Sequence, residues 1–233
     1  MSKRYIAFII FIFTIVICTL LFTTLIMDGS YMLSSIFLLC VIMLPFYIRF
    51  EKKAFVSREI VIVAVLAAIA AVSRVPFSLL PSVQPTSFVI IVSAIVFGSE
   101  TGFMIGATAA IVSNIFLGQG PWTPWQMFAW GMIGFIAGVL RNTFLMKKLW
   151  GRILYGFIVG FMFGWIMNLW GLLGFMQEAT WETVLAYYVA SFYFDLSHAI
   201  SNVIFLMLFS SSWITILTRF KKKYGILDKH KVM

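Results

Sequence analysis

Residues 118–130 read GQGPWTPWQMFAW and lie between two apolar segments that are each long enough to be membrane helices. The glycines and the prolines Pro121 and Pro124 prevent a continuous helix at the start of this stretch. Three tryptophans and two glutamines nevertheless gather there. Irregular backbone at membrane depth is tolerated only where it is buried in protein or lines a cavity. We therefore expect the stretch to form one wall of a small-molecule pocket that faces outward.

The composition of the chain is that of a membrane protein. Of its 233 residues, 62% are hydrophobic and 11% are charged, and the mean hydropathy is +1.04. We count eight candidate membrane spans, of which the third and fourth are short, namely 5–27, 31–49, 59–73, 87–98, 101–117, 125–140, 153–175 and 187–217. The first of them is too long for a signal peptide and lacks a clear cleavage site, so we interpret it as a retained helix. The sequence predicts an all-α, polytopic helical bundle.

The placement of the basic residues predicts the orientation of this bundle in the cell membrane. If the N-terminus is cytoplasmic, every lysine and arginine except Arg74 falls on the cytoplasmic side, as the positive-inside rule requires. The C-terminus is then cytoplasmic as well. The net charge of +9 does not indicate nucleic-acid binding, because the basic residues lie in short loops without interleaved aromatic side chains.

The character of the helices changes after the basic linker at 51–58, where small residues become frequent. We therefore divide the chain into two extra N-terminal helices with their linker (1–56), a six-helix core (57–219) and a basic cytoplasmic tail (220–233). The segments 74–86, 118–126 and 176–186 would then meet at the outer end of the core.

Small residues recur at helical spacing in three of the core helices. In a membrane, such stripes allow close helix packing, either within one bundle or against a separate membrane protein. Internal packing is the simpler interpretation of each stripe. The stripes are Ala64 with Ala68, Ala67 with Ala71, then Gly131, Gly134 and Gly138, and finally Gly156, Gly160 and Gly164.

Polar residues inside the last helix form a second candidate feature. Asp195, His198 and Asn202 share one helix face, and Asn168 on the preceding helix could meet that face. An ionisable residue deep in an apolar segment is by default a functional candidate. A buried hydrogen-bond network that only joins the two helices would explain these residues equally well.

The tryptophans around residue 122 have two interpretations as well. Trp122, Gln126 and Trp130 would share one face once a helix begins, and Gln84 and Asn114 are nearby polar candidates. Tryptophans also gather at membrane interfaces without any ligand. Three of them among glutamines and helix breakers fit an aromatic pocket with a few polar groups better.

Several chemical classes are not indicated by the sequence. There is no phosphate-binding loop, no HExxH or CxxC metal motif, and both cysteines lie in apolar runs. Ser201, His198 and Asp195 could be assembled into a hydrolytic triad, but no nucleophile-elbow motif supports them. We therefore expect neither catalytic residues nor a bound metal, and an intramembrane hydrolase remains only a weak alternative.

The segment from Ser57 to Arg219 resembles the substrate-binding (S) components of energy-coupling-factor (ECF) vitamin transporters. The resemblance rests on the six-helix core with basic cytoplasmic loops, the alanine stripe, and the block FLGQGPWTPWQMFAWGMIGFIAG at 116–138. Among the members, the tryptophan-rich block is most similar to cobalamin-type S components. The two helices at 5–49 depart from the pattern.

This resemblance implies that the chain captures a vitamin or its precursor outside the cell, under the loop at 74–86. It also implies a membrane-embedded coupling subunit, on which Ala64 and Ala68 (or Ala67 and Ala71 in another register) dock, and two ATPase subunits that supply the energy. We expect eight residues to line or border the vitamin site: Gln84, Gln119, Trp122, Trp125, Gln126, Asn168, Asp195 and His198.

Two alternatives remain open besides the hydrolase. The substrate could be another vitamin or a precursor, since folate or riboflavin would also suit several tryptophans. A free-standing secondary carrier would require an inverted repeat and central ion ligands, and no convincing repeat is present.

Overall fold

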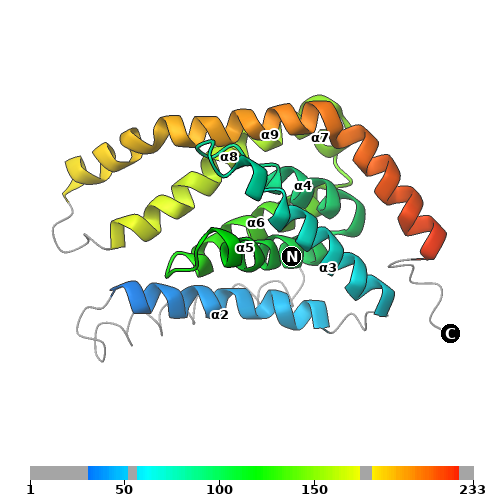
Figure 1. Cartoon of the computed structure of the whole chain (residues 1–233), viewed down its shortest axis with the longest axis horizontal. Coiled ribbons are helices and arrows are strands. Elements are labelled where there is room, and N and C mark those ends of the chain that lie inside the picture. The colour runs from blue at the N-terminus through cyan, green and yellow to red at the C-terminus, as the bar shows by residue number, and fades with distance from the viewer. Residues whose placement is uncertain (1–30, 52–56, 174–179, 226–233) are drawn as a thin grey trace.

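The computed structural model describes residues 31–51, 57–173 and 180–225, and within them it contains helices and no strands (Figure 1). The predicted helix at 5–27 lies outside the described residues. The helices are α2 (Tyr31–Glu51), α3 (Ser57–Val72), a short 3-10 helix η1 (Val75–Phe77), α4 (Thr86–Phe97), α5 (Ser99–Leu117), α6 (Thr123–Leu140), α7 (Phe144–Lys147), α8 (Leu149–Leu173) and α9 (Trp181–Tyr224). The predicted all-α architecture is confirmed.

Four helical segments of the described chain are long and apolar enough to cross a membrane. They are Glu59–Phe77, Ser99–Leu117, Leu149–Leu173 and Trp181–Tyr224. The segment at 87–98 was also interpreted as a membrane helix from the sequence, but the corresponding helix α4 is too short to cross a membrane. Its 12 residues extend about 18 Å, well under the roughly 30 Å of the hydrocarbon core.

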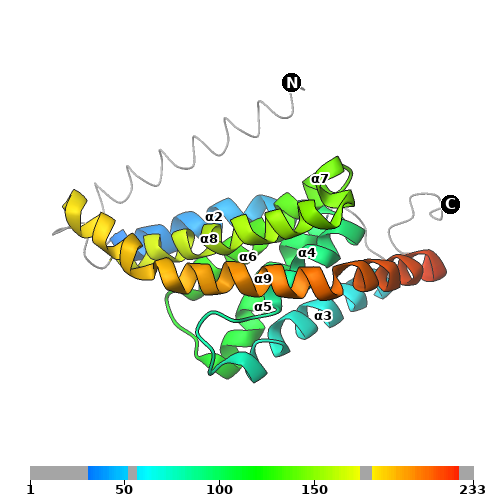
Figure 2. The ribbon, with the colours of Figure 1, turned by 90° about the horizontal axis from the view of Figure 1, so that it is seen from above.

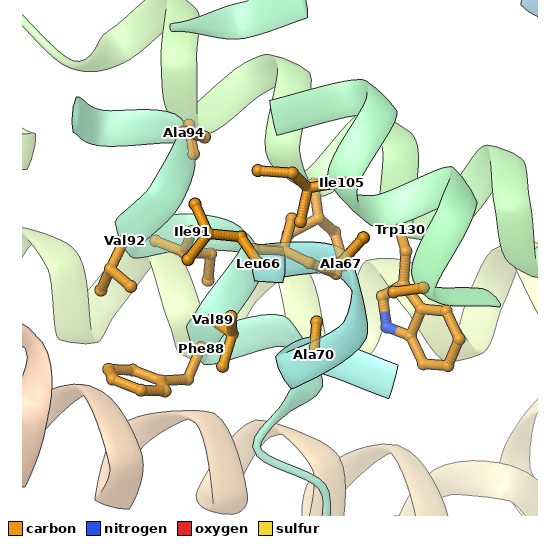
Figure 3. Close-up of a cluster of buried hydrophobic side chains, with 14 of the residues drawn as sticks. Leu66, Ala67, Ala70, Phe88, Val89, Ile91, Val92, Ala94, Ile105 and Trp130 are labelled. Atoms are coloured by element: carbon orange, nitrogen blue, oxygen red, sulfur yellow. The ribbon is translucent and has the colours of Figure 1, made fainter. Parts of the chain in front are cut away.

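Helix α4 instead forms the centre of the bundle. All its residues except Ile95 are buried, and it contacts α3, α5, α6, α8 and α9. Its valine and isoleucine side chains belong to one large apolar cluster that also contains Leu66 of α3 and Trp130 of α6 (Figure 3). The surrounding helices therefore separate α4 from the membrane.

Glycines bring two pairs of helices into backbone contact. A Cβ atom on Gly134 would collide with the backbone of Gly102, so α5 and α6 touch along this seam. A Cβ atom on Gly160 would lie 2.5 Å from Cα of Ala199, which joins α8 to α9 in the same way. The two predicted glycine stripes thus serve internal packing, which was the simpler interpretation.

Helix α2 packs on the core, on the side opposite α9 (Figure 1). The ring of Phe46 stacks on Phe103 of α5 with 4.2 Å between centroids, and it meets Phe135 of α6 edge-on at 5.0 Å. The second of the two additional helices is therefore attached through aromatic contacts to α5 and α6.

Helix α9 runs the length of the molecule and overlies the other helices (Figure 2). Its 44 residues extend about 66 Å, so it is longer than the predicted helix at 187–217. Thr180 and Thr183 form a reciprocal capping box that starts the helix at Trp181. Residues 181–186, which were expected in an outer loop, are therefore helical.

Two irregular segments lie at one end of the bundle, which we call the Arg74 end. They are residues 73–85, between α3 and α4, which are irregular apart from the short helix η1, and residues 118–122, between α5 and α6. Gly118 ends α5 with a φ of 106°, a conformation that strongly favours glycine. The predicted break after α5 is confirmed, although α6 begins at Thr123 rather than at residue 125. Pro124 fits there, because the first helical turn needs no backbone donor.

Candidate functional site

The guanidinium group of Arg74 lies inside the protein. Only 7% of the residue is exposed, although the sequence placed it in an outer loop. Its Nε donates to Oε1 of Gln84 at 2.9 Å, and its Nη1 donates to Oγ of Ser113 and to Oδ1 of Asn114. Its Cζ lies 4.7 Å from the centroid of the Trp130 ring, within the range of a cation–π contact. Arg74 therefore joins the segment 73–85 to α5 and α6.

Asn114 extends these contacts to the start of α6. Its Nδ2 donates to Oγ1 of Thr123 at 3.0 Å and to Oε1 of Gln126 at 2.6 Å. Thr123 in turn donates to Oε1 of Gln119 at 2.9 Å. We call the connected residues the Arg74 network: Arg74, Gln84, Ser113, Asn114, Gln119, Thr123 and Gln126. The three glutamines predicted for the site all belong to it.

An aromatic stack leads from Arg74 across the bundle. The fully buried ring of Trp130 stacks on Phe163 of α8, with 4.8 Å between centroids. Phe163 meets the ring of His198 edge-on at 4.9 Å. Nε2 of His198 lies 2.9 Å from Oγ of Ser87, at the start of α4. Trp130 and Phe163 therefore connect the buried guanidinium of Arg74 to the buried ring of His198.

Asp195 and Asn168 are joined through a serine. Oγ of Ser191 donates to Oδ2 of Asp195 at 3.2 Å, and Nδ2 of Asn168 donates to the same serine at 2.6 Å. The prediction that Asn168 meets this face of α9 is confirmed. Nδ2 of Asn202 donates to the carbonyl of Gly156 at 3.0 Å, so this residue joins the two helices.

The suggested hydrolytic triad does not form. Oγ of Ser201 accepts from the backbone N–H of Gln84, whereas His198 pairs with Ser87 and Asp195 pairs with Ser191. No hydrogen bond connects Ser201, His198 and Asp195 to one another among the described residues. A proton relay from serine through histidine to aspartate is therefore missing.

The tryptophans of the stretch at 118–130 turn toward the protein to different degrees. Trp122 is half-buried and meets Trp170 of α8 edge-on, with 5.7 Å between centroids. Trp125 is also half-buried, and its buried Nε1 has no acceptor among the described residues. Trp130, which was only expected to share a face with Trp122, is the most enclosed of the three.

The alanine stripe of α3 has two faces. Ala64 and Ala68 are exposed, together with Val61, Val65 and Val72, on a surface that we call the α3 face. Ala67 and Ala71 are 1% and 0% exposed and belong to the core. The structure therefore leaves only the first of the two predicted registers accessible to a partner.

Sequence reasoning missed the residues that connect the site. Arg74, Ser87, Ser113 and Phe163 were not among the predicted site residues, yet they link those that were. A signal existed for Arg74, which was the only basic residue expected on the outer side. The other three, Ser87, Ser113 and Phe163, are residue types that are common in apolar helices. Their connecting contacts are made to other segments, which the sequence does not show.

No cluster of three or more histidine, cysteine, aspartate or glutamate side chains among the described residues could hold a metal ion.

Residues 58–220 match the family described as "ECF transporter, substrate-specific component". No curated protein and no solved structure matches the chain. The matched range begins in α3 and ends in α9, so it contains the Arg74 network, the aromatic stack and the α3 face, but not α2.

Proposed function

The chain belongs to the family of ECF transporter substrate-specific components, and on this premise we propose that it captures a vitamin, with cobalamin or a related corrinoid as the favoured substrate. Proteins of this family are membrane-embedded transporter subunits, not enzymes, and they work with an ECF coupling subunit and ATPases.

One observation carries the choice of site. The Arg74 network joins the segment 73–85, the end of α5 and the start of α6 through side-chain amides. A small-molecule site is typically an apolar, aromatic enclosure with a few polar groups that fix orientation. A corrinoid combines a large flat ring with peripheral amides, so indole rings and amide side chains suit it.

We propose that the vitamin binds beneath the segment 73–85, in contact with the residues predicted from the sequence. The Arg74 network supplies Gln84, Gln119 and Gln126. The two half-buried tryptophans at the start of α6, Trp122 and Trp125, supply aromatic rings. Asn168, Asp195 and His198 would border the site on the α8 and α9 side. The charge distribution supports an outward-facing Arg74 end, with both termini in the cytoplasm.

The α3 face is the proposed docking surface for the coupling subunit. Ala64 and Ala68 let another helix approach closely, and the exposed valines beside them add apolar contact. Among the described residues α2 contacts α5, α6 and α8, so it leaves this surface uncovered. Docking would be followed by reorientation of the whole subunit and release of the vitamin inside.

The proposal is tested by purifying the chain in detergent, identifying any co-purified vitamin by mass spectrometry, and measuring the Kd of cyanocobalamin. The triple variant Trp122→Ala, Trp125→Ala, Gln126→Ala should bind at least about tenfold more weakly, because stacking and hydrogen bonds are both lost. Trp150→Ala, a 79% exposed position at the other end of the bundle, is the control. Unchanged binding by the triple variant contradicts the proposed site.

Uptake by cells that lack other vitamin routes tests the mechanism. It should require co-expression of the coupling subunit and the ATPases. Uptake by this chain alone would instead identify a free-standing carrier.

A further inference from the structure

Arg74 carries a buried positive charge that no carboxylate neutralises among the described residues. The three acceptors of its hydrogen bonds are the neutral side chains of Gln84, Ser113 and Asn114. A buried charge without a partner of opposite sign is strongly unfavourable, and in a membrane protein it indicates a functional position. The local arrangement therefore lacks one negative charge.

The surroundings of Arg74 also have more donors than acceptors. Its hydrogen bonds to described residues use Nε and Nη1, and none uses Nη2. The ring of Trp130 lies against the guanidinium. The buried indole Nε1 of Trp130 has no acceptor among the described residues. Trp125, less than two turns earlier on α6, has a buried Nε1 in the same condition. A ligand that brings acceptor atoms would satisfy groups that the protein leaves unpaired.

The guanidinium is held in a fixed orientation. Hydrogen bonds hold Nε and both N–H groups of Nη1, and the Trp130 ring covers one face, so the remaining N–H groups, which are both on Nη2, keep their direction. The free N–H groups of Nη2 can donate charge-assisted hydrogen bonds to an oxygen of a carboxylate or phosphate. Arg74 and its acceptor Gln84 both lie in the segment 73–85, so this segment itself supplies the positive charge.

We infer that the captured vitamin carries an anionic group, a carboxylate or a phosphate, and that Arg74 binds it. This inference rests on the proposed function and narrows its substrate. It agrees with cobalamin, which contains a phosphodiester, and with acidic vitamins such as folate, biotin and pantothenate. It excludes riboflavin, which is neutral, and thiamine, which is cationic.

The ligand arm of the test uses the unaltered full chain in a nonionic detergent. Isothermal titration compares cyanocobalamin with cobinamide, a corrinoid that lacks the phosphodiester, and then the three acidic vitamins with riboflavin and thiamine. We expect the tightest ligand to be anionic and cobinamide to bind at least about tenfold more weakly than cyanocobalamin if a corrinoid is the substrate. Tight binding of riboflavin, thiamine or cobinamide overturns the inference and leaves the proposed function standing. Binding of none of these compounds overturns both.

The protein arm compares Arg74→Gln and Arg74→Lys with Arg152→Gln. Arg152 is also 7% exposed, but it lies at the opposite end of the bundle, where it donates to Ser211. Arg74→Gln should weaken binding of the anionic ligand at least about tenfold, Arg74→Lys should weaken it less, and Arg152→Gln should leave it unchanged.

The decisive readout is selectivity rather than affinity alone. Arg74→Gln should remove the preference for the anionic compound over its neutral analogue. The neutral analogue has no anionic group to interact with the guanidinium, so loss of the positive charge should not weaken its binding. Equal weakening of both compounds would assign Arg74 a purely structural role and overturn the inference. If Arg74→Gln does not fold, Arg74→Lys and the ligand arm decide. Displacement of the vitamin by phosphatidylglycerol, lost in Arg74→Lys or Arg74→Gln, would instead assign the group to a lipid phosphate and overturn it.

Discussion

The hydroxyl group of Ser201 binds the backbone of Gln84 twice, although the two residues are 117 positions apart. Its Oγ accepts the N–H of Gln84 at 3.0 Å and donates to the carbonyl of Gln84 at 3.3 Å. Since Arg74 binds Ser113 and Asn114 on α5, the segment 73–85 is attached to α9 near one end and to α5 near the other. If the vitamin binds beneath this segment, as we propose, it can enter only when some of these bonds open.

Ser201→Ala should therefore loosen the segment without unfolding the protein. Two hydrogen bonds are removed, each contributing about 1 kcal/mol. We expect faster hydrogen–deuterium exchange in a peptide covering residues 78–84, and faster release of bound vitamin. Ser197→Ala is the matched control, because Ser197 donates only to Tyr193 within its own helix. Equal exchange in both variants would contradict the attachment described here.

Ala68→Leu should separate docking from folding. The side chain is exposed on the α3 face, so a larger residue should leave vitamin binding unchanged and should reduce co-purification of the coupling subunit about tenfold. Ala71→Leu is the contrasting variant, because Ala71 is 0% exposed and the added volume should destabilise the isolated subunit. Normal assembly of Ala68→Leu would show that the coupling subunit docks elsewhere.

Gly160→Leu should force α8 and α9 apart. The added atoms would meet the backbone of Ala199, which cannot move aside as a flexible side chain could. We expect a loss of about 3 kcal/mol in the free energy of unfolding, seen as a lower Tm in detergent. Ala190→Leu, at an exposed position of α9, should leave Tm unchanged. A wild-type Tm for Gly160→Leu would mean that the two helices are not in backbone contact.

Phe46→Ala should weaken the attachment of α2 to the core. The variant loses the ring contacts to Phe103 and Phe135, which should lower the free energy of unfolding by about 3 kcal/mol. Leu44→Ala on the exposed side of the same helix should have little effect. The measurement is Tm by differential scanning fluorimetry, and equal shifts in the two variants would argue against this packing.

Much of the architecture follows from local sequence signals. Apolar length predicts the helices, Gly118 and Pro121 predict the break before α6, and the glycine stripes predict close helix contacts. These features depend on residues near one another in the chain, which is why they can be read before any tertiary contact is known.

The connections within the site depend on tertiary contacts instead. Ser87 meets His198 across 111 positions, and Arg74 meets Asn114 across 40. A hydropathy pattern assigns Arg74 to a loop, but only the folded bundle shows that α5 and α6 supply partners that keep it inside. The same holds for α4, whose short length becomes meaningful once five helices are seen around it.

The enclosure of α4 has a consequence for the behaviour of the protein in different membranes. The thickness of the bilayer acts on the helices that touch acyl chains. These helices tilt or shift to match it. Helix α4 is shielded from that mismatch, and its first residues, Thr86 and Ser87, are tied to the carbonyl of Ala70 and to His198. The start of α4, next to the segment 73–85, therefore keeps its depth and geometry when the bilayer around the protein becomes thinner or thicker.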